Sequence, residues 1–325
     1  MANVEATLLV EASEPVKPLL DGEIAAKGMT LHVGEAVTID DNSRRMAKLD
    51  FDIAEVSLGT YLKARDQGLP VVGLPIFTSG RQFLHGGFQL AARSGLRDPS
   101  KLRGRVLGTG QYWQGPPIWQ RHLLKELYGI APEDVSWVML RPERMEGMGV
   151  PPGVPHRLDD SGRTAAELAA AGEIDAQLSR GARAPGAPGS SDQPPALLPA
   201  FPDRTAAERA YYERTGVYPI LHLTVIREDL ANEHPEVVES VCDAFTRAKA
   251  LVREHEGGHA SESGEIGEIS IDMLEVVGGD PWPFGITPNR QSLQAFVDTA
   301  LDQHLVDRPY RVEELFVARL PDDMQ

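Results

Sequence analysis

The chain has 325 residues, of which 42% are hydrophobic and 25% charged, so it is neither disordered nor fibrous and is long enough for about two domains. Its 48 acidic and 32 basic residues give a net charge of −16 without a run of Lys or Arg, and nucleic acid is not an expected partner. The first residues lack the basic start of a signal peptide, and no apolar stretch reaches 18 residues. We expect a soluble, cytoplasmic protein without a membrane partner.

The first part of the chain alternates short apolar runs with amphipathic segments. A helix is expected to begin directly after Ser57, a residue type that caps helices. The alternation predicts an α/β unit with a largely parallel sheet. The expected strands are 7–10, 29–33, 51–56, 71–77 and 88–92.

A second unit is expected from the turn-rich step at 98–104 onward. Its strands are predicted at 105–109 and 174–178, and a helix begins at Pro116. Two capping boxes, which begin at Thr164 and Thr205, predict the starts of two further helices. The Pro- and Gly-rich stretch 182–199 is interpreted as an irregular loop.

The apolar stretch 218–227 predicts a strand that returns to the first unit, followed by long helices over 235–256 and 288–305. The fold class is therefore α/β with two lobes: residues 1–98 and 218–325 form lobe 1, and residues 99–217 form the inserted lobe 2. Ligands of such sheets bind at the carboxyl ends of strands. The loops expected to line a cleft between the lobes are 55–57, 78–85, 110–115 and the segment from Ser179 onward.

Polar side chains at these strand ends are the candidate site residues. His222 lies in an otherwise apolar strand, where both a core histidine and a catalyst are open interpretations. Arg81 and His85 flank an apolar pair, and a solvated loop is the alternative there. The candidates are Glu55, Ser57, Ser79, Arg81, His85, Tyr112, Gln114, Arg180 and His222.

Other chemistry is not indicated by the motifs. His255 and His259 match the HExxH pattern by letter, but Gly257 and Gly258 break the helix that zinc binding requires. No dinucleotide loop, phosphate loop or nucleophile motif occurs, and Cys242 falls on the apolar stripe of a helix, as a core residue would. The sequence predicts no metal site and no cofactor.

Five stretches of the chain together resemble the 4,5-dihydroxyphthalate decarboxylase family. The resemblance runs in order along nearly the whole chain, and the last two stretches are specific. The stretches are Asp-Ile-Ala-Glu-Val-Ser-Leu-Gly-Thr-Tyr at 52–61, Pro-Ile-Phe-Thr-Ser-Gly-Arg-Gln-Phe-Leu-His at 75–85, Gly-Glu-Ile-Asp-Ala at 172–176, Tyr-Tyr-Glu-Arg-Thr-Gly-Val-Tyr-Pro-Ile-Leu-His at 211–222, and Asp-Pro-Trp-Pro-Phe-Gly-Ile-Thr-Pro-Asn-Arg at 280–290.

The resemblance implies a fold like that of type II periplasmic solute-binding proteins, with two α/β lobes and a ligand cleft. It implies an enzyme, a cofactor-independent carboxy-lyase that removes CO₂ from a small hydroxylated aromatic carboxylate by protonating the ring. Gly115 and the stretch 179–185 depart from the family pattern, so the substrate can differ. A homo-oligomer is one of the states that the residues allow.

The implied chemistry needs a proton donor, a partner for the phenol and a cation for a carboxylate. His222 or His85 can supply the proton, and Arg81 can bind a carboxylate with two hydrogen bonds. Glu55 or Tyr112 can engage the phenol, and Ser57, Ser79, Gln114 and Arg180 are the remaining substrate-binding candidates. The alternatives are a solute-binding protein of an uptake transporter and another lyase on the same scaffold.

Overall fold

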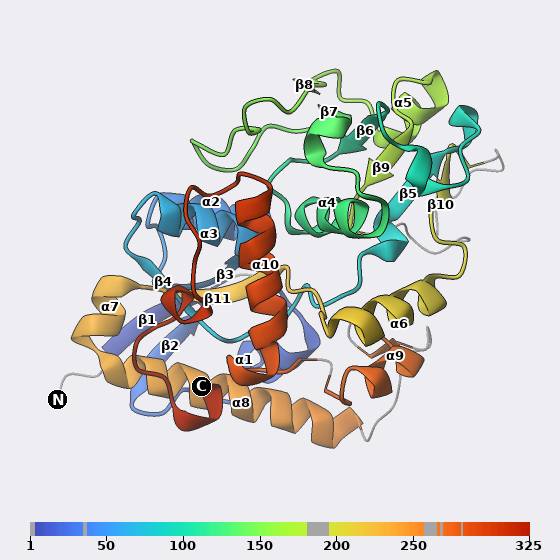
Figure 1. Cartoon of the computed structure of the whole chain (residues 1–325). Helices are drawn as coiled ribbons and strands as arrows, with labels where there is room; N and C mark the ends of the chain where they lie inside the picture. The colour runs from blue at the N-terminus through green and yellow to red at the C-terminus, as the bar shows by residue number, and fades with distance from the viewer. Residues whose placement is uncertain (1–3, 35–37, 181–194, 257–264, 267–268, 281) are drawn as a thin grey trace. The chain divides into compact units, whose positions relative to one another are not determined.

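The chain folds into two compact α/β units in a computed structural model (Figure 1). Unit 1 comprises residues 1–82, 215–301 and 306–325, and unit 2 comprises residues 83–214 and 302–305. The structure describes residues 4–34, 38–180, 195–256, 265–266, 269–280 and 282–325. Each unit contains one large sheet, which agrees with the predicted pair of α/β lobes.

Unit 1 is built on a five-stranded sheet with the order β2-β1-β3-β11-β4. The central strand β3 is buried on both faces, as its apolar residues require. β1 runs parallel to β2 and β3, whereas β11 runs antiparallel to β3 and β4. The strands are β1 (Val4–Leu9), β2 (Met29–Val33), β3 (Ile53–Ser57), β4 (Val71–Leu74) and β11 (His222–Arg227).

The helices of unit 1 cover its sheet and supply the core. α8 passes beside α1 and α7 (Figure 1) and buries an apolar stripe with spacings of three and four. Cys242 lies on this stripe and is buried, which raises the pKa of its thiol to about 12 and confirms it as a core residue. The elements are α1 (Lys17–Leu20), α2 (Ile39–Ala47), α3 (Leu58–Asp66), α7 (Glu228–Glu233), α8 (Pro235–Glu256), α9 (Ile271–Val276), α10 (Arg290–Asp302) and the strand pair β12 (Glu265–Ile266) and β13 (Ile269–Ser270).

Unit 2 is built on a six-stranded sheet with the order β10-β5-β9-β6-β7-β8. β6 is parallel to β7 and β9, whereas β5 is antiparallel to β9 and β10. Thr164 forms the predicted capping box with Glu167 at the start of α5. The elements are β5 (Phe88–Ala91), β6 (Val106–Thr109), α4 (Gly115–Tyr128), β7 (Ser136–Met139), β8 (His156–Leu158), α5 (Ala165–Ala171), β9 (Ala176–Leu178), β10 (Leu197–Pro199) and α6 (Arg204–Thr215).

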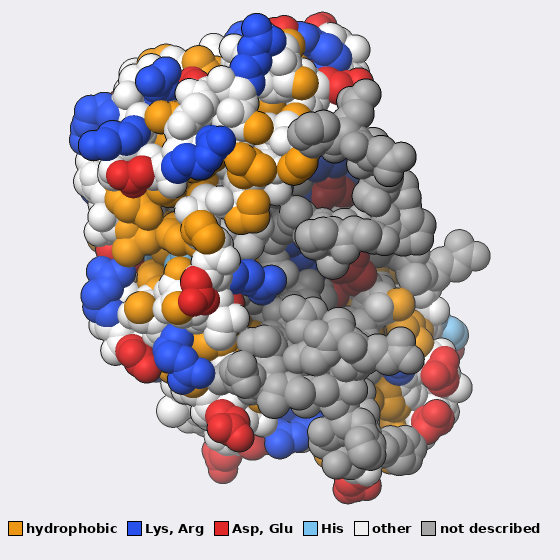
Figure 2. All heavy atoms as spheres, turned by 90° about the vertical axis from the view of Figure 1, so that its right-hand side faces the viewer, with side chains coloured by type: hydrophobic (Ala, Val, Ile, Leu, Met, Phe, Trp, Pro, Cys, Tyr) orange, Lys and Arg blue, Asp and Glu red, His pale blue; other side chains and the backbone are white. Residues whose placement is uncertain are grey.

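Short 3-10 helices connect several of these elements. They are Glu14–Val16, His85–Gly87, Ala92–Ser94, Pro99–Lys101, Pro132–Asp134, Thr287–Asn289, Val312–Leu315 and Asp322–Met324. Among the residues that the structure describes, no helix has the length and apolar character needed to cross a membrane. On the face drawn in Figure 2, apolar side chains of the described residues gather in a group, with basic and acidic side chains scattered around it.

Several expectations differ from the structure. The sheet of unit 1 is mixed rather than largely parallel, because β11 runs antiparallel to β3 and β4. The sheet of unit 2 is mixed because β5 runs antiparallel to β9 and β10. The division between the units lies near residues 82 and 215 instead of 98 and 217, since β5 pairs with β9 and β10 of unit 2. α6 begins at Arg204, and Asp203 rather than Thr205 accepts a hydrogen bond from its first turn.

Candidate active site

The candidate site in unit 1 lies where β3 ends and β11 begins. In the register of these two strands Ser57 is opposite His222, and Glu55 is opposite Thr224. The segment that follows β4 brings Thr78 and Ser79 to the same edge. This is the carboxyl edge of the parallel strands, where α/β sheets bind ligands.

Glu55 is the centre of a buried hydrogen-bond network. Its Oε1 accepts from Ser79 Oγ at 2.7 Å and from Thr78 Oγ1 at 2.9 Å, and its Oε2 accepts from the backbone N–H of Glu11 at 3.2 Å. Burial raises the pKa of the Glu55 carboxyl to about 7, because the two hydroxyl hydrogen bonds offset only part of the lost hydration. The nearby negative charge of Glu11 adds to the rise in pKa. Near neutral pH this carboxyl can therefore both hold and release a proton.

Ser79 joins this carboxyl to the imidazole of His222. Ser79 Oγ and His222 Nδ1 share a hydrogen bond of 2.8 Å, and both side chains are 8% exposed. Gly80 makes the contact possible, because a Cβ at this position would lie 2.7 Å from His222 Nδ1 and the residue has a φ of +65°. Two hydrogen bonds thus link Glu55, in the interior of unit 1, through Ser79 to His222 at the start of β11.

Arg81 is held two residues further along the same segment. Its Nη1 donates to Asn289 Oδ1 at 2.6 Å, and its guanidinium lies 4.4 Å above the ring of Tyr218. Asn289 Nδ2 in turn donates to the carbonyls of Pro283 and Gly285 at 2.6 and 2.7 Å. The stretch 280–290, which carries part of the family resemblance, therefore orients Arg81 through Asn289.

Ser57 occupies the position expected from the sequence at the start of α3, but its side chain does not cap the helix. The side chain is 2% exposed, and its Oγ has no hydrogen-bond partner within the described part of the chain. The backbone N–H of Ser57 donates to Ser43 Oγ at 3.3 Å.

His85 belongs to unit 2 and has a different environment from that of His222. It packs edge-on against Phe201 and Tyr211, and burial followed by the charge of Arg204 lowers the pKa of its imidazole to about 4. His85 is therefore neutral near pH 7. The convergence of His85 with Arg81 and His222, which lie in unit 1, stays a prediction.

The remaining candidates also lie in unit 2, around the start of α4. Tyr112 is fully buried beneath the guanidinium of Arg121, 3.8 Å from its ring, and burial raises the pKa of its phenol. Gln114 is the N-cap residue of α4, and its Oε1 accepts from the backbone N–H of Gln111 at 3.3 Å. Arg180 is exposed after β9.

Two charged residues in unit 2 were not predicted from the sequence. Glu143 Oε1 accepts from the backbone N–H groups of Tyr112 and Trp113 at 2.5 and 3.3 Å, and burial raises the pKa of its carboxyl to about 7. Arg121 is 1% exposed and donates through Nε to Gln303 at 2.7 Å. Candidates were sought at the carboxyl ends of predicted strands, which we call the strand-end rule. Neither residue follows a predicted strand directly, so this rule could not find them.

In unit 1, three residues were not predicted as site residues: Glu11, Thr78 and Asn289. Glu11 comes shortly after the end of β1 and Thr78 directly precedes Ser79, so the strand-end rule could have found both. Asn289 stands in the resembling stretch 280–290, where nothing in the sequence shows that it contacts Arg81.

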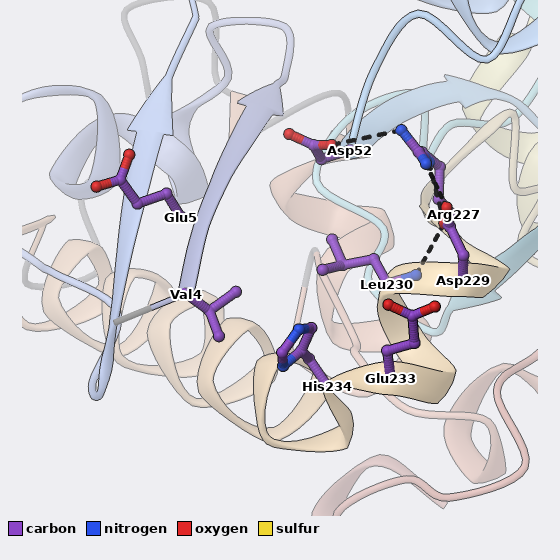
Figure 3. A pocket seen from close by; sticks show the side chains of 8 residues that line it. All are labelled: Val4, Glu5, Asp52, Arg227, Asp229, Leu230, Glu233 and His234. Carbon is purple, nitrogen blue, oxygen red and sulfur yellow. Dashed lines mark hydrogen bonds and ion pairs between the residues drawn. The ribbon is translucent and has the colours of Figure 1, made fainter. Parts of the chain in front are cut away.

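A separate cavity of about 400 Å³ lies at the other end of the unit 1 strands, where β1 and β3 begin (Figure 3). Two of its carboxylates have structural partners: Asp52 accepts from the N–H and hydroxyl of Thr7, both at 2.8 Å, and Asp229 pairs with Arg227. It is lined by Val4, Glu5, Asp52, Arg227, Asp229, Leu230, Glu233 and His234.

Within the described ranges, no group of three His, Cys, Asp or Glu side chains is placed to hold a metal ion. The HExxH match at 255–259 lies partly outside the described residues.

Comparison with curated proteins gives two relatives with the same name. The chain is 28% identical over 330 residues to 4,5-dihydroxyphthalate decarboxylase of Comamonas testosteroni, which covers 97% of each protein. It is 30% identical over 128 residues to 4,5-dihydroxyphthalate decarboxylase of Pseudomonas putida, covering 38% of this chain and 48% of that protein. No family model matches the sequence. The resemblance inferred from the motifs is confirmed.

Solved structures show the fold. The alkanesulfonate-binding protein of Xanthomonas axonopodis pv. citri has a TM-score of 0.54 at 13% identity, and 98% of this chain and 99% of that chain are covered. The Candida albicans CA3427 product, described as having the generic periplasmic binding protein fold, has a TM-score of 0.52 at 11% identity, with 98% and 99% covered. The predicted periplasmic-binding-protein-like fold is confirmed.

Proposed function

We propose that the protein is a decarboxylase of a hydroxylated aromatic carboxylate such as 4,5-dihydroxyphthalate. The observation that carries the proposal is the similarity along 97% of its length to a protein of that name. The geometry of unit 1 supports it. His222 on β11 is joined through Ser79 to the Glu55 carboxyl, and Asn289 holds Arg81 on the segment that contains Ser79. These groups match a proton donor and a carboxylate-binding cation.

The reaction proceeds by protonation of the ring. A hydroxyl para to the leaving carboxylate gives up its proton to water, and the electron density that moves into the ring lets the carboxylate-bearing carbon accept a proton. The bond from this carbon to the carboxylate then breaks, its electron pair restores the aromatic ring, and CO₂ leaves. The phenolate oxygen that results takes a proton back from water. The hydroxyl supplies the electrons, so we propose that no cofactor is required.

Within this scheme His222 is the proton donor. His85 is the weaker candidate, because a pKa of about 4 leaves its imidazole without a second proton at neutral pH. Glu55 acts behind the histidine and does not engage the phenol, since its carboxyl oxygens are already bound by Thr78, Ser79 and the Glu11 backbone. Tyr112, the other residue expected to engage the phenol, is fully buried in unit 2, and its role stays a prediction.

The function is tested by incubating the purified protein with 4,5-dihydroxyphthalate and related hydroxylated benzoates. We expect release of CO₂ that persists after treatment with a chelator. The second candidate function is a solute-binding protein, which the fold shared with alkanesulfonate-binding proteins favours. Tight binding of one of these acids without CO₂ release would decide for that alternative.

Replacing Arg81 should mainly weaken substrate binding. We expect Arg81→Met to raise KM or Kd by roughly 10- to 150-fold, because a charge-assisted hydrogen bond to a carboxylate contributes about 1.5–3 kcal/mol. Titration calorimetry with the wild type and the variant measures the change. Arg44, which is exposed on α2 and pairs with Asp41, offers the matched control Arg44→Met. Equal affinities in all three proteins would remove Arg81 from the binding site.

A further inference from the structure

We infer that Glu55 stores a proton for His222 and that Ser79 carries it between them. This inference rests on the proposed function for its role in turnover, although the proton transfer itself is a property of the protein without substrate. Glu55 and Ser79 are then positioning residues that act through the histidine.

Ser79 has only one hydroxyl proton for its hydrogen bonds to Glu55 and His222, and the inference rests on this fact. Its single hydroxyl proton has two near acceptors, Glu55 Oε1 at 2.7 Å and His222 Nδ1 at 2.8 Å, and a more distant one, Glu11 Oε2 at 3.4 Å. If Glu55 is ionised, Ser79 donates to Glu55 and accepts from Nδ1–H of His222. If Glu55 is protonated, Glu55 donates to Ser79, and Ser79 donates to the bare Nδ1. Both arrangements fit the same heavy-atom positions, so they can interchange without movement of the chain.

The interchange transfers one proton in a balanced way. The O–H bond of Glu55 breaks as an O–H bond forms on Ser79, while the original Ser79 proton forms an N–H bond at His222 Nδ1. Ser79 ends with one proton, as it began. The net result is an ionised Glu55 and a doubly protonated imidazole.

The surroundings keep the two arrangements close in energy. Glu55 is 0% exposed and Thr78 Oγ1 donates to it, which stabilises the carboxylate against the cost of burial. Glu11, the other carboxylate at this point, lies 3.4 Å from Ser79 Oγ and opposes a second negative charge. A pKa of about 7 for Glu55 agrees with a proton that is held but can be released.

The reaction explains why such a store is useful. A neutral imidazole that gave its Nε2 proton to a ring carbon would be left as an imidazolate, which is too basic to form at neutral pH. A proton arriving at Nδ1 from Glu55 prevents this, because His222 then remains neutral after the transfer. The cycle closes when Nε2 takes a proton from water and the two proton shifts run in reverse.

The first test needs no substrate. Protein with ¹⁵N-labelled histidine is titrated from pH 5 to 9, and the His222 signals are assigned with His222→Gln. We expect the Nδ1 shift of His222 to change with the ionisation of Glu55 in the wild type and to lose that step in Glu55→Gln, whose side chain has nearly the same shape. Thr78→Val is the matched control: it removes the other hydroxyl on the same oxygen but should keep the step. An identical titration in the wild type and Glu55→Gln would overturn the inference.

The second test uses turnover in mixtures of H₂O and D₂O. Protons that move together in one step give a curved dependence of kcat on the fraction of D₂O, and we expect this dependence to become linear in Ser79→Ala, where only the Nε2 proton moves. The same variant should lower kcat roughly 10²-fold, the lower end of the range for general acid–base catalysis, with little change in KM. Ser79→Thr, which keeps a hydroxyl, should restore the curvature.

The two tests separate the inference from the proposed function. A coupled His222 titration in a protein that decarboxylates nothing would leave the proton store standing and reject the function. Decarboxylation with no coupling between Glu55 and His222, and with an unchanged dependence on D₂O in Ser79→Ala, would support the function and reject the store.

Discussion

His222→Gln is expected to lower kcat by about 10²–10⁴-fold and to leave KM nearly unchanged. The reason is that a general acid acts in the transition state, so its loss removes stabilisation that the bound substrate does not yet have. Glutamine keeps a polar side chain of similar length at the start of β11, but it cannot release a proton. Steady-state kinetics with the best substrate found among the dihydroxylated acids measure both parameters.

The control for this variant is His32→Gln. His32 lies on β2 in the same unit and its side chain is exposed, paired with Glu5. We expect wild-type kinetics from it. If His222→Gln folds normally and keeps full turnover, His222 is a core histidine that happens to meet Ser79, and His85 becomes the proton donor to examine next.

The location of the site followed from the strand-end rule. Glu55, Ser57 and Ser79 are predicted because each ends or follows a buried strand. The register of β3 with β11 places Ser57 opposite His222, and Ser79 joins Glu55 to the histidine by hydrogen bonds. The rule works because strand ends in an α/β sheet share one edge, whatever the side chains are. The histidine itself could not be assigned from its strand, since an apolar run surrounds both core and catalytic histidines.

The direction of β11 relative to β3 could not be predicted from the sequence. An apolar strand reads the same in both directions, and only pairing decides whether its first or its last residue meets the end of β3. Had β11 run parallel to β3, Arg227 instead of His222 would lie near Ser57. The role of Glu55 depends on the same fact, because its carboxyl reaches His222 only through Ser79 in the antiparallel arrangement.

Contacts between distant segments were also unpredictable in detail. The stretch 280–290 contributes Asn289, which binds Arg81 across 208 positions of the chain. Resemblance to a family could mark the stretch as specific, but it could not say which side chain it holds. In unit 2, Glu143 lies in a loop without any motif and accepts hydrogen bonds from the backbone N–H groups of Tyr112 and Trp113.

Burial of Glu55 should also appear in the stability of the protein, apart from any activity. The folded protein keeps the Glu55 proton up to a pH of about 7, whereas the unfolded chain releases it near the ordinary value of 4.5. Between these values the folded state binds more protons, so the free energy of unfolding falls as the pH rises. A difference of about 2.5 pKa units corresponds to roughly 3 kcal/mol.

Glu55→Gln removes this titration and isolates it. Glu143 and His85 also change protonation, but they are present in both proteins and cancel in the comparison. We therefore expect the wild type to lose roughly 3 kcal/mol relative to Glu55→Gln between pH 4.5 and pH 8, measured by chemical denaturation at a series of pH values. The amide of the variant faces the Glu11 N–H, a donor, and the cost of that contact shifts its curve by a constant amount without changing its slope. Parallel curves for the two proteins would mean that the folded protein releases the Glu55 proton near the ordinary value of 4.5, and a carboxyl without a proton at neutral pH could not serve His222.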